Sequence, residues 1–474
     1  MKSYEMIAIG TGSGMAIVDA FLRKDPSARA AVIDKDEPGG ICLTRGCIPS
    51  KILLYPAELV RTIQNASEFG IDSPVRSVDF ARVMSRMRGL ISKDINGIRE
   101  GLSHSPNIDY FHATAEFTGP YTLRVDGAAI TSKLILLGLG SRATVPPIPG
   151  LGGAGYLTSD TILALDRLPS TVAVIGGGYI AAELGFFLAA MGSKVSLLGR
   201  NPQFLPAEEP EVSLVAQRAL ARQLTIRTNC VVTRVERAAN GGKVVRFEDR
   251  TTRVTQDIEV EEILVAAGRE PTSDLLHLER TGVKTDERGW VQVDDHLATT
   301  MPGIWALGDA TGRYPFKHKA NYDAQVVYYN AVLHQPTTAD YHAIPHAVFT
   351  HPEVASVGLR ESEAIDRLGS DRVLVGVYRF EDTAKGEAMA LHDFFVKVLV
   401  ERDSLKILGA HIVGPHASIL LQEIINLLYT PDRSARPILE GMHIHPALSE
   451  VVERAFGALT LAAHRHGSTA PGAS

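Results

Sequence analysis

The chain has 474 residues, more than one hydrophobic core normally holds, which predicts roughly two to four domains. Hydrophobic residues make up 45% and charged residues 22%, with a formal net charge of −6 and no long basic run, which excludes nucleic acid and anionic membrane surfaces as main partners. No apolar run reaches the roughly 20 residues that cross a bilayer, and the N-terminus has no signal-peptide layout, so we expect a cytoplasmic protein without membrane contact.

The N-terminal segment predicts a βαβ unit. An apolar strand over residues 6–9 leads into Gly10-Thr11-Gly12-Ser13-Gly14, a helical stretch over 15–23 follows, and a second strand over 30–33 ends at Asp34. In such a unit the glycines let the backbone approach a pyrophosphate, which the N–H groups at the helix start bind. A carboxylate at the end of the second strand suits a free ribose hydroxyl, so we assign this turn and Asp34 to an FAD site.

Two of the three cysteines, Cys42 and Cys47, lie five positions apart behind a pair of glycines. Structural zinc is a poor interpretation, because it needs four ligands and the sequence has no second cysteine pair. Positions five apart in a regular helix are separated by about 7.5 Å along the axis, so a bridge between these cysteines requires a distorted backbone. A strained, accessible disulfide is easily reduced, and a helix start stabilises a thiolate. The spacing therefore favours redox chemistry.

A second βαβ unit begins after the proline-rich stretch 146–150, which predicts a domain boundary. Its strand covers 172–175, its turn reads Gly176-x-Gly178-x-x-Ala181, and a helix and a further strand over 194–198 follow. Two such units in one chain predict two dinucleotide sites, which is stronger support than either turn alone.

The residue that ends the second strand distinguishes the two sites. Arg200 lies 24 residues after Gly176, and Asp34 lies 24 residues after Gly10. An arginine at this place suits a 2′-phosphate, so Arg200 favours NADP over NAD, while a solvated surface charge stays open as the alternative.

The pattern changes in the last third of the chain, after a second predicted boundary near 335–336. Strand patterns over 395–400 and 407–413 alternate with helical patterns over 418–428 and 448–461. We therefore expect a separate mixed domain.

The segment 39–51, Gly-Gly-Ile-Cys-Leu-Thr-Arg-Gly-Cys-Ile-Pro-Ser-Lys, resembles the active-site segment of the pyridine nucleotide–disulfide oxidoreductases, a family that includes dihydrolipoamide dehydrogenase, glutathione reductase and mycothione reductase. The resemblance covers nearly the whole chain. It implies an α/β fold with two Rossmann-like dinucleotide-binding domains, for FAD and for NADP or NAD, plus a C-terminal α+β dimerisation domain. The expected parts are an FAD-binding domain over 1–147, an NAD(P)-binding domain over 148–270, a return segment of the FAD-binding and central domain over 271–340, the dimerisation domain over 341–465 and a flexible tail over 466–474.

The resemblance also assigns roles to the thiols and to two charged residues. It implies that Cys47 faces the flavin as a charge-transfer thiolate and that Cys42 attacks a substrate disulfide. Lys51 looks like the family's lysine near flavin N5, paired with Glu183. Without the resemblance, both would be interpreted as ordinary helix-surface charges.

Further segments resemble the remaining signatures of the family. Residues 304–309 resemble the second FAD signature, whose aspartate, here Asp309, binds a ribityl hydroxyl. Gly140 and Gly268 lie in the segments that resemble the two crossings between the FAD-binding and NAD(P)-binding domains.

The segment from His443 to Glu450 resembles the catalytic histidine segment of the family. It implies an acid/base role for His445, with Glu450 as the carboxylate that orients the ring, and it leaves His443 without a role. In the family this segment acts on the other subunit's site, so the resemblance implies an obligate homodimer.

Together these features predict an FAD-dependent NAD(P)H:disulfide oxidoreductase, in which electrons pass from the nicotinamide through FAD to the Cys42–Cys47 disulfide and on to a small disulfide. The substrate stays open, because residues 317–321 resemble mycothione reductase and residues 448–450 resemble the lipoamide enzymes. The alternatives are a mercuric-type metal-ion reductase, disfavoured by the lack of a second thiol pair near the C-terminus, and an NAD(P)H oxidase on the same scaffold. We predict no resident metal.

Overall fold

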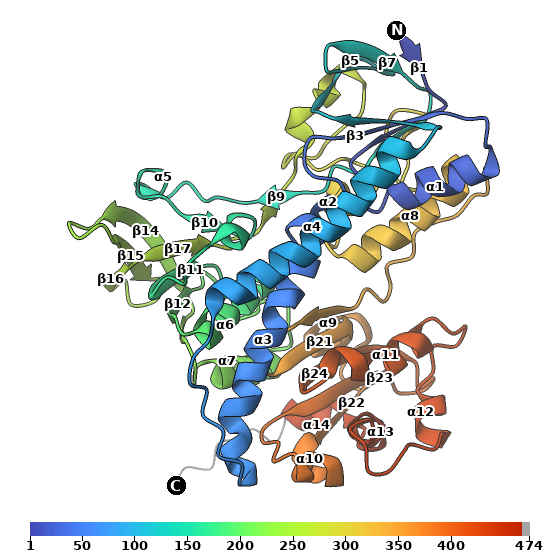
Figure 1. Cartoon of the computed structure of the whole chain (residues 1–474). Coiled ribbons are helices and arrows are strands. Elements are labelled where there is room, and N and C mark those ends of the chain that lie inside the picture. The colour runs from blue at the N-terminus through green and yellow to red at the C-terminus, as the bar shows by residue number, and fades with distance from the viewer. Residues whose placement is uncertain (467–474) are drawn as a thin grey trace.

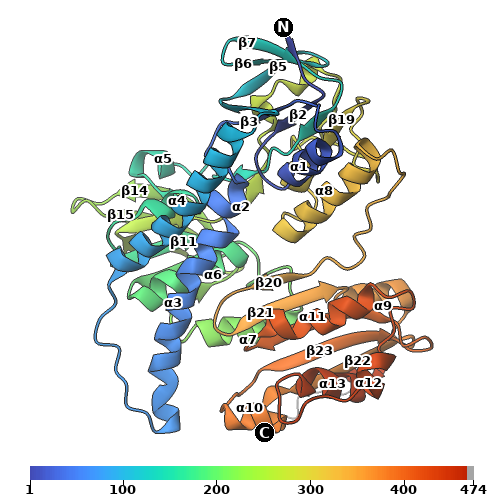
Figure 2. The ribbon, with the colours of Figure 1, turned by 45° about the vertical axis from the view of Figure 1, so that its right-hand side comes forward.

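The computed structural model describes residues 1–466 and arranges them around three large β-sheets with their covering helices (Figures 1 and 2). Of the predicted flexible tail, 466–474, all but its first residue lies outside the described residues. Within residues 1–466, none of the helices combines the length and apolar character needed to cross a membrane.

The first large sheet has five parallel strands in the order β19-β8-β2-β3-β4. They are Met6–Ile9 (β2), Ala30–Asp34 (β3), Ile108–His112 (β4), Ile135–Leu137 (β8) and Ile304–Ala306 (β19). Met6 belongs to the core beneath α1 (Met15–Lys24) and α8 (Lys317–Ala331), whereas Ile7 belongs to the core beneath a four-stranded sheet. Coverage of both faces explains why β2 and β3 are apolar at successive positions. The four-stranded sheet has the order β1-β7-β6-β5 and comprises Lys2–Ser3 (β1), Ala115–Gly119 (β5), Thr122–Val125 (β6) and Ala128–Thr131 (β7).

The second large sheet, also parallel, has the order β10-β17-β11-β12-β13. Its strands are Leu157–Thr158 (β10), Thr171–Ile175 (β11), Lys194–Leu198 (β12), Thr225–Arg227 (β13) and Glu262–Val265 (β17). The helices α6 (Tyr179–Met191) and α7 (Pro210–Leu220) share one core with it. The other face is covered by Leu151–Ala154 (α5) and the antiparallel strands Cys230–Arg237 (β14), Lys243–Asp249 (β15) and Thr255–Val260 (β16). Both predicted βαβ units are therefore present.

Two strands and two long helices join these halves. The two predicted crossings pair with each other as antiparallel strands, Arg142–Ala143 (β9) and Arg269–Glu270 (β18). The helices α3 (Cys47–Asn65) and α4 (Phe80–His104) run along the molecule beside α6 (Figure 1), and Leu53, Ala57 and Phe80 share its core. The short helix α2 (Gly40–Thr44) precedes α3 directly. The cysteine segment is therefore placed between the two halves that contain the parallel sheets.

The C-terminal domain is built on a six-stranded antiparallel sheet of order β20-β21-β24-β23-β22-β25. Its strands are His346–Val348 (β20), Glu353–Gly358 (β21), Val373–Arg379 (β22), Phe395–Glu401 (β23), Ile407–Gly414 (β24) and Thr460–Leu461 (β25). Its helices are Glu361–Leu368 (α9), Ala384–Ala388 (α10), Ala417–Leu428 (α11), Arg436–Glu440 (α12), Glu450–Gly457 (α13) and Ala462–His466 (α14).

The helix expected over 448–461 is shorter than predicted. It ends at Gly457 because the chain then turns to add β25 to the sheet, where Leu461 pairs with Leu374. The apolar residues at the end of the predicted helix therefore lie in a strand, and not on the helix face that their spacing indicated.

Candidate active site

A cavity of about 1340 Å³ brings together residues from the first sheet, from α3 and α6 and from the C-terminal domain. Pockets for drug-sized ligands measure roughly 300–1000 Å³, so this cavity has room for a dinucleotide. The predicted site residues that line it are Gly10, Gly12, Gly14, Asp34, Cys42, Cys47, Lys51, Gly140, Glu183 and Asp309.

The first glycine turn is fixed by close backbone packing. Gly10 has a φ of 100°, and a Cβ on it would lie 2.1 Å from the carbonyl oxygen of Gly138. The N–H and the hydroxyl of Thr11 donate to Asp34 Oδ2 at 2.8 and 2.5 Å, which holds the carboxylate at the turn. At the start of α1 the N–H groups of Met15, Ala16 and Ile17 bond the carbonyl oxygens of Gly12, Ser13 and Gly14, so the N–H groups left for a ligand are those of the turn itself. This glycine cradle, helix start and carboxylate form a donor set that fits the pyrophosphate and ribose of FAD.

The two thiols lie on different helices, because Cys42 belongs to α2 and Cys47 begins α3. Only Arg45 and Gly46 connect the helices. A Cβ on Gly46 would lie 2.9 Å from the carbonyl oxygen of Ile41 and 3.2 Å from Cys42 Cα, so glycine lets the thiol-bearing segments approach. The side chains of Cys42 and Cys47 interact directly, because each is the largest influence on the pKa of the other. The predicted departure from a regular helix is confirmed.

The thiol pair is electrostatically asymmetric. The hydrogen bond from Cys42 lowers the pKa of Cys47 from 9.0 to about 7, and the ammonium of Lys51 also lowers it, while burial and Glu183 oppose the shift. The same hydrogen bond, together with burial, raises the pKa of Cys42. Near neutral pH, Cys47 is therefore substantially a thiolate, and Cys42 is the thiol that donates to it.

Lys51 lies one helical turn beyond Cys47 and pairs with Glu183. Its Nζ is 2.9 and 2.8 Å from the two carboxylate oxygens, although 132 residues separate them. The Glu183 side chain is 5% exposed and also accepts the N–H of Phe349 at 3.0 Å. The Lys51 side chain is 37% exposed toward the cavity, and its ammonium lies 4.6 Å from the ring centroid of Phe349. The carboxylate thus holds a cation beside the thiolate.

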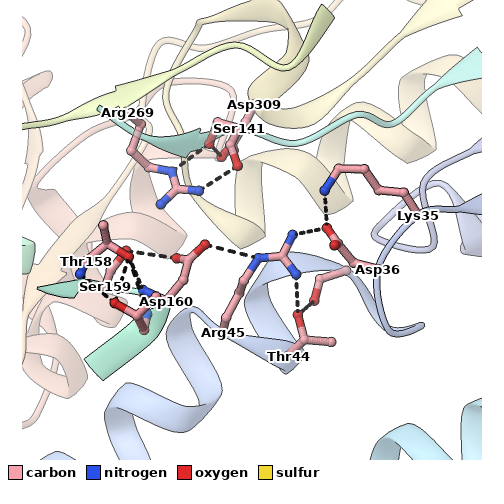
Figure 3. Close-up of polar contacts among 12 residues, drawn as sticks. Lys35, Asp36, Thr44, Arg45, Ser141, Thr158, Ser159, Asp160, Arg269 and Asp309 are labelled. Carbon is pink, nitrogen blue, oxygen red and sulfur yellow. Dashed lines mark hydrogen bonds and ion pairs between the residues drawn. The ribbon is translucent and has the colours of Figure 1, made fainter. Parts of the chain in front are cut away.

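Asp309 is held by the two crossings (Figure 3). Ser141, in the first crossing, donates from Oγ to Asp309 Oδ2 at 2.6 Å. Arg269, in the second crossing, donates from Nε to Ser141 Oγ at 2.6 Å and from Nη2 to the Ser141 carbonyl oxygen at 2.7 Å. The carboxylate therefore stands in the cavity at a fixed place beside Gly140, whose φ of 65° turns the chain there.

The second glycine turn repeats the geometry of the first. Gly176 has a φ of 145°, and a Cβ on it would lie 2.1 Å from the carbonyl oxygen of Ala266. Gly178 directly precedes α6, and Ala181, buried in that helix, lies against Gly176. Gly268 has a φ of 131° and lies in the second crossing. Both turns thus place a helix start at the carboxyl end of a parallel strand.

Arg200 is exposed at the carboxyl end of β12. Arg250, in the turn after β15, donates from Nη1 to the Arg200 carbonyl oxygen at 3.2 Å. The backbone N–H of Arg250 donates to the carbonyl oxygen of Asn229 at 2.9 Å, and the backbone N–H of Asn229 donates to the carbonyl oxygen of Asn201 at 2.8 Å. Two guanidinium-bearing residues therefore stand at the strand end where the sequence predicts a 2′-phosphate.

His445 and Glu450 lie in the C-terminal domain, and neither is among the residues that line the cavity. His445 Nδ1 lies 2.9 Å from Glu450 Oε1, and the N–H of Ala447 donates to Oε2 at 3.1 Å. The hydrogen bond from His445 lowers the pKa of Glu450, so the carboxylate is ionised. The imidazole is 68% exposed. Within one chain the predicted proton-handling pair is therefore apart from the thiols, and His443, which has no predicted role, contacts Glu423 at 3.6 Å.

Sequence reasoning gave no role to several cations that line the cavity, among them Arg45 and Lys317. Lys317 donates from Nζ to Ser13 Oγ, inside the first glycine turn, at 2.8 Å and across 304 positions of the chain. Arg45 forms ion pairs with Asp36 and Asp160. Their only signal in the sequence was position, Arg45 between the two cysteines and Lys317 at a helix start, because partners so distant follow from the tertiary fold.

Comparisons with known proteins agree with this geometry. The sequence model described as "Pyridine nucleotide-disulphide oxidoreductase" matches residues 4–324, and that of the dimerisation domain of the same family matches residues 344–456. The chain is 35% identical to mycothione reductase of Mycobacterium tuberculosis, over 96% of this chain and 99% of that protein. It is 32% identical to dihydrolipoyl dehydrogenase of Synechocystis, over 96% and 98%. Among solved structures, the Cu(II) complex of the HOCl-induced flavoprotein disulfide reductase RclA from Escherichia coli matches with a TM-score of 0.84 at 27% identity, covering 96% of this chain and 99% of that one. The expected fold class is confirmed.

Proposed function

Because this chain belongs to the pyridine nucleotide-disulphide oxidoreductase family, whose members depend on FAD and NAD(P), we propose that it reduces a small disulfide, or oxidises the corresponding dithiol, through Cys42 and Cys47. The observation that carries the proposal is the asymmetric thiol pair, which shares one cavity with the glycine turn. Zinc binding or mere structural bridging would not require one thiol with a lowered and one with a raised pKa.

The cavity residues divide into those that would hold FAD and those that would act on sulfur. The first glycine turn and Asp34 would hold the pyrophosphate and the ribose, and Asp309 the ribityl chain. Lys51, fixed by Glu183, would stand near the ring. When bound, FAD supplies the hydride acceptor for a reduced nicotinamide and the electron pair that opens the Cys42–Cys47 disulfide.

The thiol chemistry follows from the asymmetry of the pair. Cys42 loses its proton to a base and attacks one sulfur of the substrate disulfide, forming a mixed disulfide and releasing one thiolate, which takes up that proton. The thiolate of Cys47 then attacks Cys42 Sγ, which re-forms the internal disulfide and releases the second substrate thiolate. The stabilisation of the Cys47 thiolate beside Lys51 keeps this nucleophile ready. Oxidation of a dithiol runs the same steps in reverse.

We assign the base to His445 of the partner subunit. The support is that His445 is oriented by Glu450 through Nδ1 yet is 68% exposed and apart from its own thiol pair. A complementation test uses two inactive variants, Cys42→Ala and His445→Gln, mixed so that subunits exchange. If each site combines two chains, half of the dimers are mixed and carry one intact site, so about a quarter of wild-type activity returns. If each site lies within one chain, the mixture stays inactive.

We further propose NADPH as the preferred reductant, because Arg200 and Arg250 stand together at the end of β12. Replacing either by glutamate is expected to lower kcat/KM for NADPH about tenfold or more, the effect of about 1.4 kcal/mol or more, and to spare NADH. Arg253→Glu is the matched control, because Arg253 lies in the same turn and is paired with Glu248. Equal losses of kcat/KM with NADPH and NADH would contradict the proposal and favour the interpretation of Arg200 as a solvated surface charge.

The decisive experiment is a substrate panel on the FAD-loaded protein. Lipoamide, oxidised glutathione and a mycothiol-type disulfide are tested with each nicotinamide, beside Cu(II), Hg(II) and oxygen. The metal ions are included because the chain is 33% identical to mercuric reductase of Staphylococcus aureus, over 87% of this chain and 75% of that protein. The chain also resembles the RclA structure solved as a Cu(II) complex. Disulfide turnover that Cys42→Ser abolishes supports the proposal. Turnover of metal or oxygen alone, or disulfide turnover that survives Cys42→Ser, refutes it.

A further inference from the structure

Arg45 lies between the two cysteines in sequence, and its side chain leaves this connection to contact both halves of the molecule (Figure 3). Its Nη2 is 2.5 Å from Oδ2 of Asp36, which follows β3 in the first half. Its Nε is 3.3 Å from Oδ2 of Asp160, which follows β10 in the second half. The side chains of Arg45, Asp36 and Asp160 are about a quarter to a third exposed. One guanidinium thus bridges two carboxylates across the thiol segment.

Both carboxylates are themselves held in place. The N–H of Asp36 donates to Asp34 Oδ1 at 3.0 Å, and the ammonium of Lys35 lies 2.8 Å from Asp36 Oδ2. Asp160 accepts the hydroxyl of Ser159 at 3.0 Å. The guanidinium of Arg45 is therefore held by Asp36 and Asp160, which both lie outside the cysteine segment.

The connection that Arg45 occupies determines how the thiols meet. α2 carries Cys42 and ends at Thr44, and α3 starts with Cys47, so the relative placement of the sulfurs depends on two residues. Gly46 supplies the close approach, and Arg45 is the residue whose side chain is tethered on either side. A turn held in this way loses less freedom when the sulfurs join, which favours ring closure.

We propose that Arg45 is a positioning residue that holds the two thiol-bearing helices at the separation at which the disulfide closes. The proposal rests on the redox role proposed for the pair. The equilibrium concerned is protein disulfide plus dithiothreitol giving protein dithiol plus oxidised dithiothreitol, in which one S–S bond breaks, another forms, and two electrons and two protons move. Loss of the tether shifts this equilibrium toward the protein dithiol.

The test measures that equilibrium on the FAD-saturated full chain. Protein is held in buffers with graded ratios of reduced to oxidised dithiothreitol, quenched with acid, alkylated, and analysed by mass for the dithiol fraction. Arg45→Met is expected to shift the equilibrium toward the dithiol about three- to tenfold, within what two such ion pairs can supply. For a two-electron couple this makes the potential about 15–30 mV more positive. Arg45→Lys and Asp160→Asn are expected to give smaller shifts in the same direction.

A purely structural ion pair would behave differently. The control is Arg124→Met, which removes the ion pair between Arg124 and Glu116 in the four-stranded sheet, neither of which lines the cavity. It is expected to change the melting temperature without moving the thiol equilibrium. The proposal is overturned if Arg45→Met and Asp160→Asn leave the equilibrium at the wild-type value, whatever their melting temperatures. If the wild-type pair itself does not equilibrate with dithiothreitol, the proposed function fails instead.

Discussion

Replacing Cys42 by alanine is expected to move the pKa of Cys47 from about 7 back toward 9.0. The reason is that the largest cause of the lowered value is the hydrogen bond from the Cys42 thiol, and alanine has no donor. A full return would lower the thiolate fraction at pH 7 from about one half to about one percent, roughly fiftyfold. A thiolate of higher pKa is also a better nucleophile, by about eightfold over this interval, so alkylation at pH 7 slows about sixfold.

The assay is the rate of carbamidomethylation by iodoacetamide as a function of pH, on reduced, flavin-free protein so that no cofactor shields the sulfur. Cys230→Ser serves as the background, and peptide mass analysis identifies the modified sulfur, so that alkylation of Cys47 is followed separately from alkylation of Cys42 in the parent. The expected profiles cross, because the Cys42→Ala variant reacts more slowly near pH 7 and faster above pH 9 than its parent. Cys42→Ser is the matched control, since its hydroxyl still donates a hydrogen bond, and its profile is expected between the two.

Two outcomes would refute this reasoning. If Cys47 keeps a midpoint near 7 in the Cys42→Ala variant, the hydrogen bond is not the main cause, and Lys51 or the start of α3 must stabilise the thiolate. If the midpoint moves equally in Cys42→Ala and Cys42→Ser, loss of packing at α2 and not loss of a donor is responsible.

Two further predictions concern neighbouring charges. Lys51→Met is expected to raise the pKa of Cys47 and Glu183→Gln to lower it, because the ammonium and the carboxylate act on the thiolate with opposite signs; shifts in the same direction in the alkylation assay would contradict this. Lys319→Met is expected to lower the free energy of unfolding in urea by about 3–5 kcal/mol, because Lys319 and Asp323 form a fully buried ion pair at 2.7 Å and the variant leaves the carboxylate uncompensated. The double variant with Asp323→Asn, whose amide oxygen can still accept the Gly308 N–H, should regain part of this loss, and a single variant as stable as wild type would contradict the prediction.

The sequence was most informative where one short segment performs a local task. Both glycine turns sit between a strand and a helix as predicted, because the requirement for φ above zero and for close backbone approach is a property of a few adjacent residues. The cysteine spacing likewise predicted a distorted backbone from distances alone. Such features can be read without knowing the fold.

Contacts between distant segments could be predicted from the sequence only through the family resemblance, and some could not be predicted at all. Lys51 and Glu183 are 132 positions apart, and neither type of residue nor spacing predicts their pairing. Arg250 reaches the backbone of Arg200 across 50 positions through a turn that carries no motif. The predicted end of α13 was wrong for a related reason. The chain after Gly457 adds β25 to the sheet, and this pairing overrides the helical pattern of the sequence.

The two nucleotide sites share one architecture, and the proposed assignment requires them to select different ligands. Asp34 is held at its turn by Thr11, so a 2′-phosphate placed there would meet a fixed negative charge. Arg200 with Arg250 offers the opposite charge at the equivalent place in the second site. Specificity is a difference between the affinities of one ligand for two sites. The positive charge in the second site attracts a 2′-phosphate, and the negative charge at the equivalent place in the first site repels it. Under the proposed assignment, the charge at the end of the second strand of each βαβ unit directs two similar dinucleotides to different sites of one chain.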